Sequence, residues 1–337
     1  MSAPYHRTRR VAIVGASTLP GKELNQVLED RNFPVTDIRL LDDNPLAGTL
    51  TEAGGEPSFI RAPDEESFQH IDFAFFAGTR EFTARLWSLA HRAGATVIDL
   101  SGALAEVPMV IPWIPALDAV LPPPQPPVGK VFFSPASATV IACTFAAALA
   151  PFCMERLVIF FLQPVSERGQ PGIDELESQT VKLLSFQPIS QEVFDAQVAF
   201  NLLGRYGEAS HPQLSDLRAI VARDVARYLA SRVCVPVIQL VQAPVFYSYA
   251  FMVYAELASP RPPAELERAL AAAGARLQGP EEPGPSNVSV AGESQIVLAR
   301  IDPDADMQSG CWIWGAADNV RLAAVNAVTI AEKLLAS

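Results

Sequence analysis

Apolar residues recur along the first third of the chain with two different periods. Short apolar runs, rich in β-branched or aromatic residues, predict buried strands at residues 10–14, 38–41, 71–76 and 97–100. Between them, apolar positions three and four apart predict helices at residues 21–31 and 79–93. Strands that alternate with helices in this way predict a parallel sheet with helices on both faces.

The second half of the chain lacks this strict alternation. Apolar runs predict strands at residues 157–162, 235–245 and 251–257, and helices at residues 138–150, 174–184, 214–229 and 319–335. An irregular order of this kind predicts an α+β domain with an antiparallel or mixed sheet. The proline-rich residues 121–127 predict an extended connector, because proline removes backbone donors and fixes φ.

These patterns predict an α/β protein of two domains. The first strand ends at Gly15 and a helix follows, which is typical of a Rossmann-like dinucleotide-binding domain; we place that domain at residues 1–133. Residues 134–317 are expected to form the α+β domain with a mixed sheet, used for dimerisation. Residues 318–337 are expected to form a C-terminal helix that returns to the first domain.

Composition excludes several classes of protein. Half of the 337 residues are hydrophobic and 18% are charged, which indicates a folded chain. A net charge of -12 argues against a nucleic-acid partner, and no run reaches the roughly 18 apolar residues of a membrane span. The short apolar run after Arg10 does not make a signal peptide, so we expect a cytoplasmic protein. The four cysteines show no C-x-x-C spacing, and we interpret them as buried structural thiols without a metal.

Motifs spread over nearly the whole chain resemble one enzyme family. The segments that carry the resemblance are residues 11–24, 31–34, 93–101, 194–201, 244–246 and 318–327. In this order they resemble the aspartate-semialdehyde dehydrogenase family, and most of all its Usg-like paralogues, which lack the catalytic residues. The resemblance implies reduction of aspartyl-β-phosphate with NADPH, or the reverse reaction. It also implies a cysteine nucleophile, a histidine base and arginines that hold the substrate anions.

The positions that should carry this chemistry hold other residues. Ser137 stands at the position of the cysteine, Tyr249 at that of the histidine, and Gln242 and Ala105 at those of two arginines. A serine needs an adjacent base to become a nucleophile, and a phenol with a pKa near 10 is a poor base. We therefore interpret Ser137 as a helix N-cap rather than a nucleophile, and Tyr249 as a core or rim residue rather than a catalyst.

The loop that lies near the nicotinamide in the family is also changed. It reads Ser166-Glu167-Arg168-Gly169 in place of the family's Ser-Gly-Ala-Gly. Ser166 and Arg168 are the candidates for contacts with an anion or substrate. The alternative for Arg168, which we favour, is an exposed loop arginine.

The resemblance also implies a weakened nucleotide site. The cofactor-binding candidates are Gly15, Ser17, Thr18, Gly21, Asp42, Asp43 and Asn319. Thr18 replaces a glycine of the family loop, and Pro20 lacks an N–H group. Asp42 and Asp43 would repel a 2′-phosphate but could bond a free ribose hydroxyl, unless both are solvated turn residues. No cofactor is firmly implied; NAD is compatible with these residues and NADP is disfavoured.

Three functional hypotheses follow from these replacements. The first is a non-catalytic paralogue that acts by binding or assembly, as a homodimer through its second domain. The second is a functional NAD(P)-dependent semialdehyde oxidoreductase with altered chemistry, using Ser137, Tyr249 and Arg168. The third is a regulatory partner that forms a heteromer with an active enzyme of the family.

Overall fold

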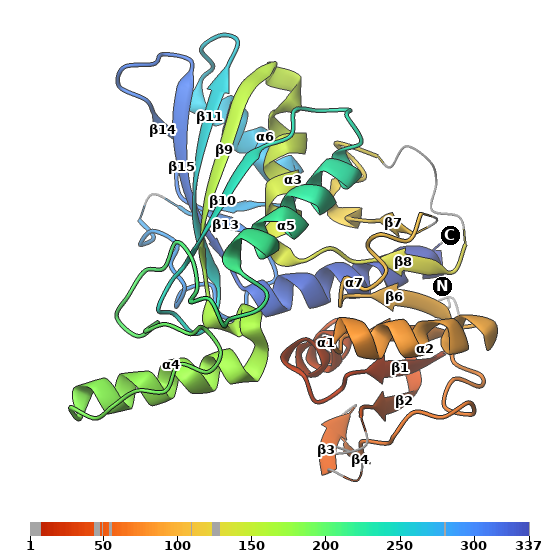
Figure 1. Cartoon of the computed structure of the whole chain (residues 1–337). Helices are drawn as coiled ribbons and strands as arrows, with labels where there is room; N and C mark the ends of the chain where they lie inside the picture. Colours follow the sequence, from red (N-terminus) through yellow and green to blue (C-terminus); the bar gives the residue numbers. More distant parts are fainter. Residues whose placement is uncertain are drawn as a thin grey trace. The chain divides into compact units, whose positions relative to one another are not determined.

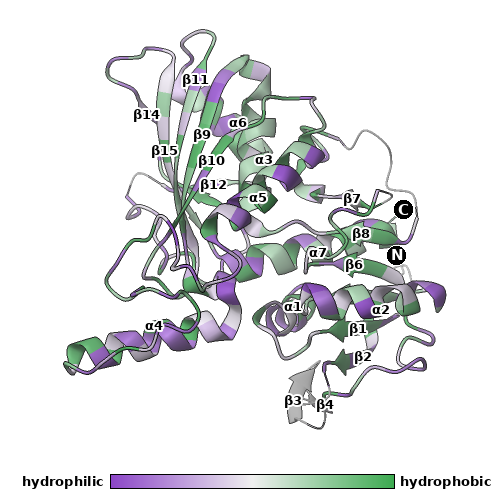
Figure 2. Ribbon diagram, in the orientation of Figure 1, coloured by the Kyte–Doolittle hydropathy of each residue, from purple (hydrophilic) through white to green (hydrophobic). Residues whose placement is uncertain are grey.

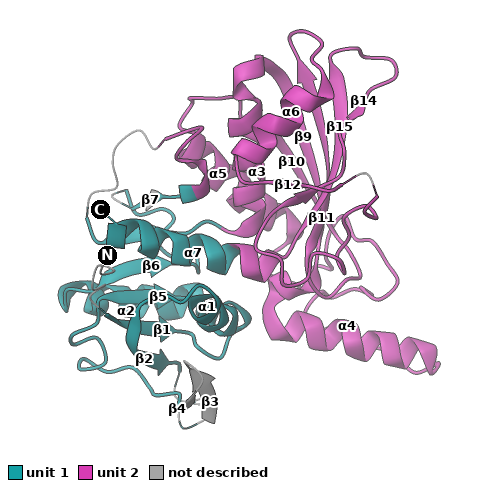
Figure 3. Cartoon of the chain, turned by 180° about the vertical axis from the view of Figure 1, so that it is seen from behind, with its two compact units in different colours: residues 1–115, 123–135, 323–337 teal, residues 116–122, 136–322 magenta. Residues whose placement is uncertain are grey.

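The computed structural model divides into two compact units, each built around its own sheet (Figures 1 and 3). Unit 1 comprises Met1–Pro115, Pro123–Pro135 and Ala323–Ser337, and unit 2 comprises Ala116–Pro122 and Ala136–Leu322. The structure describes residues 8–43, 48, 50–53, 56–108, 110–122, 129–279 and 281–336. Residues 123–127 of the predicted connector lie outside these ranges.

The sheet of unit 1 has six strands in the order β2-β1-β5-β6-β8-β7, and all its pairings are parallel. Its strands are β1 (Arg9–Val14), β2 (Val35–Leu41), β5 (Phe73–Phe76), β6 (Thr96–Asp99), β7 (Ile111–Pro112) and β8 (Val131–Phe133). A separate hairpin joins β3 (Leu50–Ala53) to β4 (Glu56–Phe59). The Rossmann-like parallel sheet predicted from the sequence is thereby confirmed.

Helices cover both faces of this sheet. On one face, α1 (Leu19–Asp30) and the unit 1 part of α7 (Asn319–Ala336) pack on side chains of β1 such as Val11 and Ile13. On the other face, α2 (Arg80–Arg92) packs on the alternate residues Ala12 and Val14. Side chains alternate between the faces of a strand, so a strand buried on both faces reads as a continuous apolar run.

The turn between β1 and α1 depends on Gly15. Its φ of +88° lies in the region that favours glycine. A Cβ on Gly15 would overlap the backbone of Gly78, so the close approach of the two loops also requires glycine.

We expect Gly15→Ala to lower the free energy of unfolding by about 2 to 4 kcal/mol, from backbone strain plus overpacking. Gly94→Ala is the matched control, since Gly94 has a φ of +92° but open space around its Cβ position. It should cost only the strain, about 1 to 2 kcal/mol. Urea denaturation measures the free energy of unfolding of both variants. Equal losses would show that the backbone near Gly78 shifts to accommodate the added methyl group at no cost.

The sheet of unit 2 is mixed, as predicted, with the order β10-β9-β11-β15-β13-β12 and β14 paired to β15. Its strands are β9 (Met154–Gln163), β10 (Val237–Gln242), β11 (Tyr249–Leu257), β12 (Arg276–Leu277), β13 (Val297–Leu298), β14 (Asp302–Pro303) and β15 (Gly310–Ala317). β10 runs parallel to β9, whereas β11 runs antiparallel to both β9 and β15.

Helix α3 (Ser137–Leu149) is the centre of the unit 2 core. All its residues are buried, and Figure 2 shows it as hydrophobic along its length. It packs against β9, α5 (Leu214–Leu229) and α6 (Pro263–Ala272). Helix α4 (Gly169–Leu184) begins five residues before its predicted start, because a proline at its third position is tolerated in a first helical turn.

The prediction of four buried thiols is wrong for two of them. Cys143 and Cys311 are buried, but Cys153 and Cys234 are exposed. Cys153 follows a short 3-10 turn with a φ of +53°, and Cys234 lies in the connection from α5 to β10. Both are loop positions flanked by apolar residues, so local hydrophobicity is misleading there.

Candidate functional site

Four residues of unit 2 form hydrogen bonds with Asn319, the first residue of α7. Asn319 Oδ1 accepts from Ser248 N–H at 3.0 Å and from Ser166 Oγ at 3.2 Å. Asn319 Nδ2 donates to Glu167 Oε1 at 2.8 Å, and its backbone carbonyl accepts from Ser137 Oγ at 2.5 Å. We call this group, together with Tyr249, the Asn319 cluster. It unites four residues that the sequence singles out: Ser137, Ser166, Tyr249 and Asn319.

Secondary structure positions each member of the cluster. Ser137 is the first residue of α3 and Tyr249 the first residue of β11. Asp318 caps α7, since its Oδ1 accepts from the amides of Val320 and Arg321 at 3.0 Å each. Asn319 is therefore held at a fixed helix start, and its side chain is free to bond the surrounding loops.

The interpretation of Ser137 as an N-cap is wrong. Ala136 occupies the cap position of α3, without a side-chain hydrogen bond. Ser137 lies one residue further on, is buried, and turns its hydroxyl to the carbonyl of Asn319 instead of to the helix amides. Its proton is thus donated to a carbonyl oxygen, which cannot act as a general base.

Tyr249 lies in the core, as expected for a strand tyrosine. It is 2% exposed, and its ring meets Phe161 edge-on with 5.4 Å between centroids. Burial, with further contributions from Glu167 and Tyr206, raises the pKa of the Tyr249 phenol well above its usual range. The phenol is therefore protonated at neutral pH and can donate a hydrogen bond but cannot accept a proton.

Glu167 is a member of the cluster that the sequence patterns did not single out. The residue as a whole is exposed, but its carboxyl group is surrounded by protein. This burial raises the pKa of the carboxyl group, and hydrogen bonds from Asn319 and Tyr249 partly oppose the rise. The signal that could have found it is compositional, because Glu167 introduces a carboxylate into a loop that has none in the family. The neighbouring Arg168 is the more conspicuous change in that loop, so the sequence pattern drew attention to Arg168 instead of Glu167.

A second polar group surrounds Gln242 at the end of β10. Gln242 is fully buried; its Oε1 accepts from the Tyr206 hydroxyl at 2.8 Å, and its Nε2 donates to the Gln163 carbonyl at 2.9 Å. Gln163 Nε2 donates in turn to the Tyr206 hydroxyl at 3.1 Å. Because these neutral groups satisfy one another, no charge is offered to a substrate anion here.

Arg168 is neither exposed nor directed at an open site. It is half-buried, and its guanidinium donates to the carbonyls of His211 at 2.8 Å and Pro212 at 2.9 Å. It also lies over the rings of Tyr206 and Phe194, at 5.4 and 5.9 Å from their centroids. Its charge thus fixes the irregular segment that follows α4.

Most backbone amides of the glycine loop of unit 1 donate hydrogen bonds to acceptors within the protein. The hydrogen bonds run from the Gly15 and Ala16 amides to Leu41 O, from Ser17 N to Asp42 Oδ2, from Thr18 N to Gly15 O, and from Gly21 N to Thr18 Oγ1. Pro20 has no N–H. Among the described residues, only Leu19 in the stretch 15–21 keeps an amide without an acceptor. A pyrophosphate is held by several such amides, so this loop does not fit one well.

The two aspartates after β2 differ from each other. Asp42 is buried, and its Oδ2 accepts from the Ser17 amide at 2.8 Å and the Ser17 hydroxyl at 2.6 Å. The interpretation as a solvated turn residue is therefore wrong for Asp42. Asp43 is exposed and forms an ion pair with Arg85 at 2.8 Å.

Ala105 belongs to the hydrophobic core of unit 1. It is buried in the cluster that includes Val97 and Leu104. The loop before it folds around Asp99, whose carboxylate accepts from the Ser101 and Leu104 amides at 2.8 Å each. Burial raises the pKa of that carboxyl group. A methyl group packed in a core offers nothing to an anion.

Two family models match the chain. Residues 10–119 match the NAD-binding domain of semialdehyde dehydrogenase, and residues 146–322 match its dimerisation domain. The fold and these two matches define a protein with an NAD-binding domain and a dimerisation domain of the semialdehyde dehydrogenase type. The chain belongs to the semialdehyde dehydrogenase family.

Relatives and solved structures agree with this. The chain is 30% identical over 332 residues to the USG-1 protein homolog of Azotobacter vinelandii, covering 96% of this chain and 97% of the relative. It is 28% identical over 336 residues to the aspartate-semialdehyde dehydrogenase of Rickettsia bellii, with the same coverage. A solved structure, a probable aspartate-semialdehyde dehydrogenase from Pseudomonas aeruginosa, has a TM-score of 0.85 at 29% identity, covering 98% of this chain and 99% of that chain. The resemblance to this family is confirmed.

Among the described residues, no helix is both long and apolar enough to cross a membrane. No group of His, Cys, Asp or Glu side chains in that part of the chain is arranged to hold a metal ion.

Proposed function

We propose that this protein is a non-catalytic member of its family and acts by binding or assembly. The observation that carries the proposal is the contact between Ser137 Oγ and the Asn319 carbonyl at 2.5 Å. A hydroxyl nucleophile must give its proton to a base, and a backbone carbonyl cannot take it. The phenol of Tyr249, with its raised pKa, does not supply that base.

The binding of substrate anions is weakened in the same way. Gln242 and Ala105 stand where the family places arginines, and both are buried and uncharged. Arg168 is bonded to the carbonyls of His211 and Pro212, so it does not replace the lost charges. Arginine holds carboxylate and phosphate by paired charge-assisted hydrogen bonds, which neutral amide and methyl groups cannot reproduce.

We propose that unit 1 tolerates NAD better than NADP. Most amides of the glycine loop bond the protein itself, which weakens the site for both cofactors. Asp42 and Asp43 add negative charge where a 2′-phosphate would lie. The pyrophosphate common to both cofactors therefore fits this loop poorly, and the extra phosphate of NADP fits it worse.

We propose further that the protein is a homodimer through the outer face of the unit 2 sheet. Cross-strand neighbours form an apolar row on that face, made of Val237, Val158, Tyr254 and Trp312. Val237 is 62% exposed and Trp312 41% exposed, and Phe160 in the next row is 39% exposed. The opposite face is buried under helices, so the open apolar face is suited to a second copy.

Light scattering at micromolar concentration should give twice the mass of one chain. The double variant Val237→Lys/Phe160→Lys places two charges on the apolar face and should shift the mass to that of a monomer, because a stable interface buries roughly 2,000 Å² or more of apolar surface. Phe59→Lys, at an exposed aromatic residue of unit 1, is the control and should leave the mass unchanged. A monomeric wild-type chain would refute the homodimer.

A further inference from the structure

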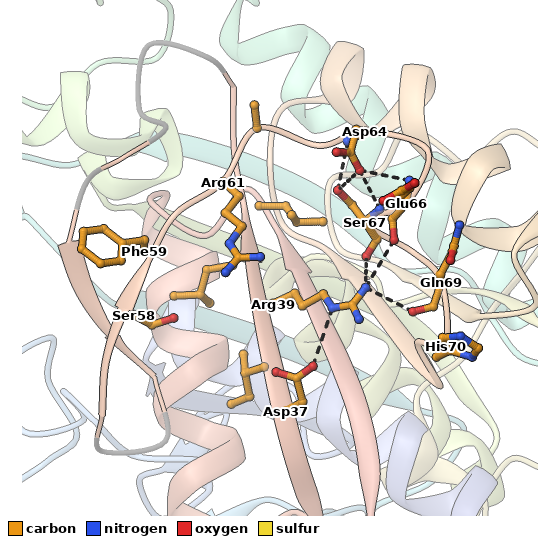
Figure 4. A pocket seen from close by; sticks show the side chains of 14 residues that line it. Asp37, Arg39, Ser58, Phe59, Arg61, Asp64, Glu66, Ser67, Gln69 and His70 are labelled. Carbon is orange, nitrogen blue, oxygen red and sulfur yellow. Dashed lines mark hydrogen bonds and ion pairs between the residues drawn. The ribbon is translucent and has the colours of Figure 1, made fainter.

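Unit 1 contains a cavity of about 580 Å³ along the free edge of β2. Its walls are β2 residues 37–41, residues 58 and 59 of β4, residues 61 and 62, and residues 64, 66, 67, 69 and 70 (Figure 4). No residue of the glycine loop 15–21 lines it. The cavity is therefore distinct from the glycine loop, although Leu41 in its lining directly precedes Asp42.

Arg39 forms one wall and is held rigidly. Its Nη1 donates to the carbonyls of Ser67 at 2.9 Å and Gln69 at 3.1 Å, and its Nε lies 3.6 Å from the Asp37 carboxylate. Figure 4 shows the Asp37 contact at one end of the guanidinium and the contacts with the carbonyls of Ser67 and Gln69 at the other. The position of this positive charge is thus fixed before any ligand arrives, which reduces the entropy cost of binding.

Arg61 forms another wall, and no acidic residue in the described part of the chain forms an ion pair with it. Its backbone is anchored to the edge of β2, since Arg61 N donates to Leu40 O at 2.9 Å and Arg61 O accepts from Asp42 N at 3.0 Å. Its guanidinium lines the cavity, and no described residue forms an ion pair or hydrogen bond with it (Figure 4). The described residues therefore leave the donors of the Arg61 guanidinium available to an anion.

The open edge of β2 adds neutral donors. Leu40 O accepts from Arg61 N, so residue 40 faces the free edge, and residue 38 faces the same way because the strand period is two. The single bridge of this edge joins Leu41 to Arg61, which leaves the Leu40 and Ile38 amides without a strand partner in the described part of the chain. Unpaired edge amides are ready donors to an oxyanion.

Two of the three carboxylates in the lining form contacts with neighbouring groups of the protein. Asp37 faces Arg39, and Asp64 Oδ1 accepts from the Ser67 hydroxyl at 2.6 Å and amide at 2.7 Å. The hydrogen bond from Ser67 lowers the pKa of Asp64, which keeps it ionised and bonded to its own turn. Asp64 therefore keeps its negative charge, so Asp64 and Glu66 of the described lining both oppose an anion, and of the three carboxylates only Asp37 is paired with a cation.

We propose that this cavity binds the carboxylate or phosphate group of a small molecule, through Arg61, Arg39 and the edge amides of β2. Guanidinium groups bond such oxyanions by paired, charge-assisted hydrogen bonds. The volume is ample for an organic body behind the oxyanion, since ligand pockets commonly span about 300–1,000 Å³. The proposal does not depend on whether the protein is catalytic.

The test follows the arginine Nε–Hε signals of the full chain by nuclear magnetic resonance. Inorganic phosphate and acetate are titrated separately, against sodium chloride at matched ionic strength. The Arg61 signal should shift and saturate in the millimolar range with at least one of the two oxyanions, and the two arms show which oxyanion is preferred. Shifts identical to those with chloride would overturn the proposal.

Variants separate the site from general charge effects. Arg61→Gln should weaken binding about tenfold or more, since it removes charge-assisted hydrogen bonds. Glu66→Gln should strengthen binding several-fold by removing one of the opposing charges. Arg92→Gln, on the exposed surface of α2, is the matched control and should change nothing. An unchanged affinity in Arg61→Gln would exclude the cavity, and displacement of phosphate by NAD would show that it is part of a nucleotide site.

Discussion

Purified protein supplied with aspartate-β-semialdehyde, phosphate and either NAD or NADP should show no phosphate-dependent reduction of the cofactor. Loss of a thiolate and of its base removes the covalent intermediate, which costs far more than a weakened contact. In the structure the Ser137 hydroxyl donates to a carbonyl, and the phenol of Tyr249 is protonated. Clear turnover by the wild-type chain would refute both the assignment of these positions and the non-catalytic role.

Restoring the nucleophile alone should not rescue activity. Ser137→Cys places a thiol at the first turn of α3, where the helix dipole favours the thiolate. Tyr249, Gln242 and Ala105 would still deny it a base and anion contacts. The informative comparison is Ser137→Cys against Ser137→Cys/Tyr249→His/Gln242→Arg, with circular dichroism to confirm folding. Activity in the single variant would mean that another group serves as the base.

Calorimetric titration should show that NADP binds more weakly than NAD, with both affinities low. One like-charge contact at about 4 Å costs on the order of 1 kcal/mol in water-like surroundings, about a fivefold loss of affinity. The loss grows as the surroundings become less polar. Arg85 forms an ion pair with Asp43 and reduces the repulsion from that residue, so the preference for NAD depends mainly on Asp42. The low affinity for both cofactors depends on the loop amides that already bond the protein, such as that of Ser17. Micromolar binding of NADP, tighter than that of NAD, would contradict it.

The loop offers a gain-of-function variant for the same prediction. Pro20→Ala adds an amide at the start of α1 without touching the cap. Thr18→Gly releases the Gly21 amide, which now bonds Thr18 Oγ1 at 3.1 Å. Together they should tighten binding of NAD about tenfold or more, since each restored amide can bond a charged phosphate. No change in the double variant would show that amide supply is not what limits binding.

The sequence predicts the framework better than the site. Each strand of the unit 1 sheet buried on both faces gives an unbroken apolar run, and helix α5 begins and ends where its period predicts. Site residues depend instead on where a single side chain turns. The residues next to Ser137 in the sequence do not indicate that it bonds a carbonyl 182 positions later. Likewise, the residues next to Arg168 do not indicate that its guanidinium lies over the ring of Tyr206. Buried polar contacts between distant segments are set by tertiary packing, which periodicity does not encode.

Resemblance to the family locates the right positions but not their new partners. Asn319 is a nucleotide-binding candidate by resemblance, and in unit 2 it joins Ser166, Glu167 and Ser137. Asp42 is a turn residue or a ribose ligand by the same reasoning, and in the structure it anchors Ser17. In both cases a polar side chain in a site that resembles a cofactor site bonds the protein itself.

Helix α3 has a consequence for how such a chain can change over generations. Every one of its residues is buried, so it has no face on which a larger side chain fits without displacing a neighbour. The Asn319 cluster beside its first residue is held by interchangeable polar contacts, many of which a serine, amide or hydroxyl could satisfy. Mutational drift is therefore far more restricted in the framework than in the chemistry, and a lineage can lose a reaction while its architecture persists.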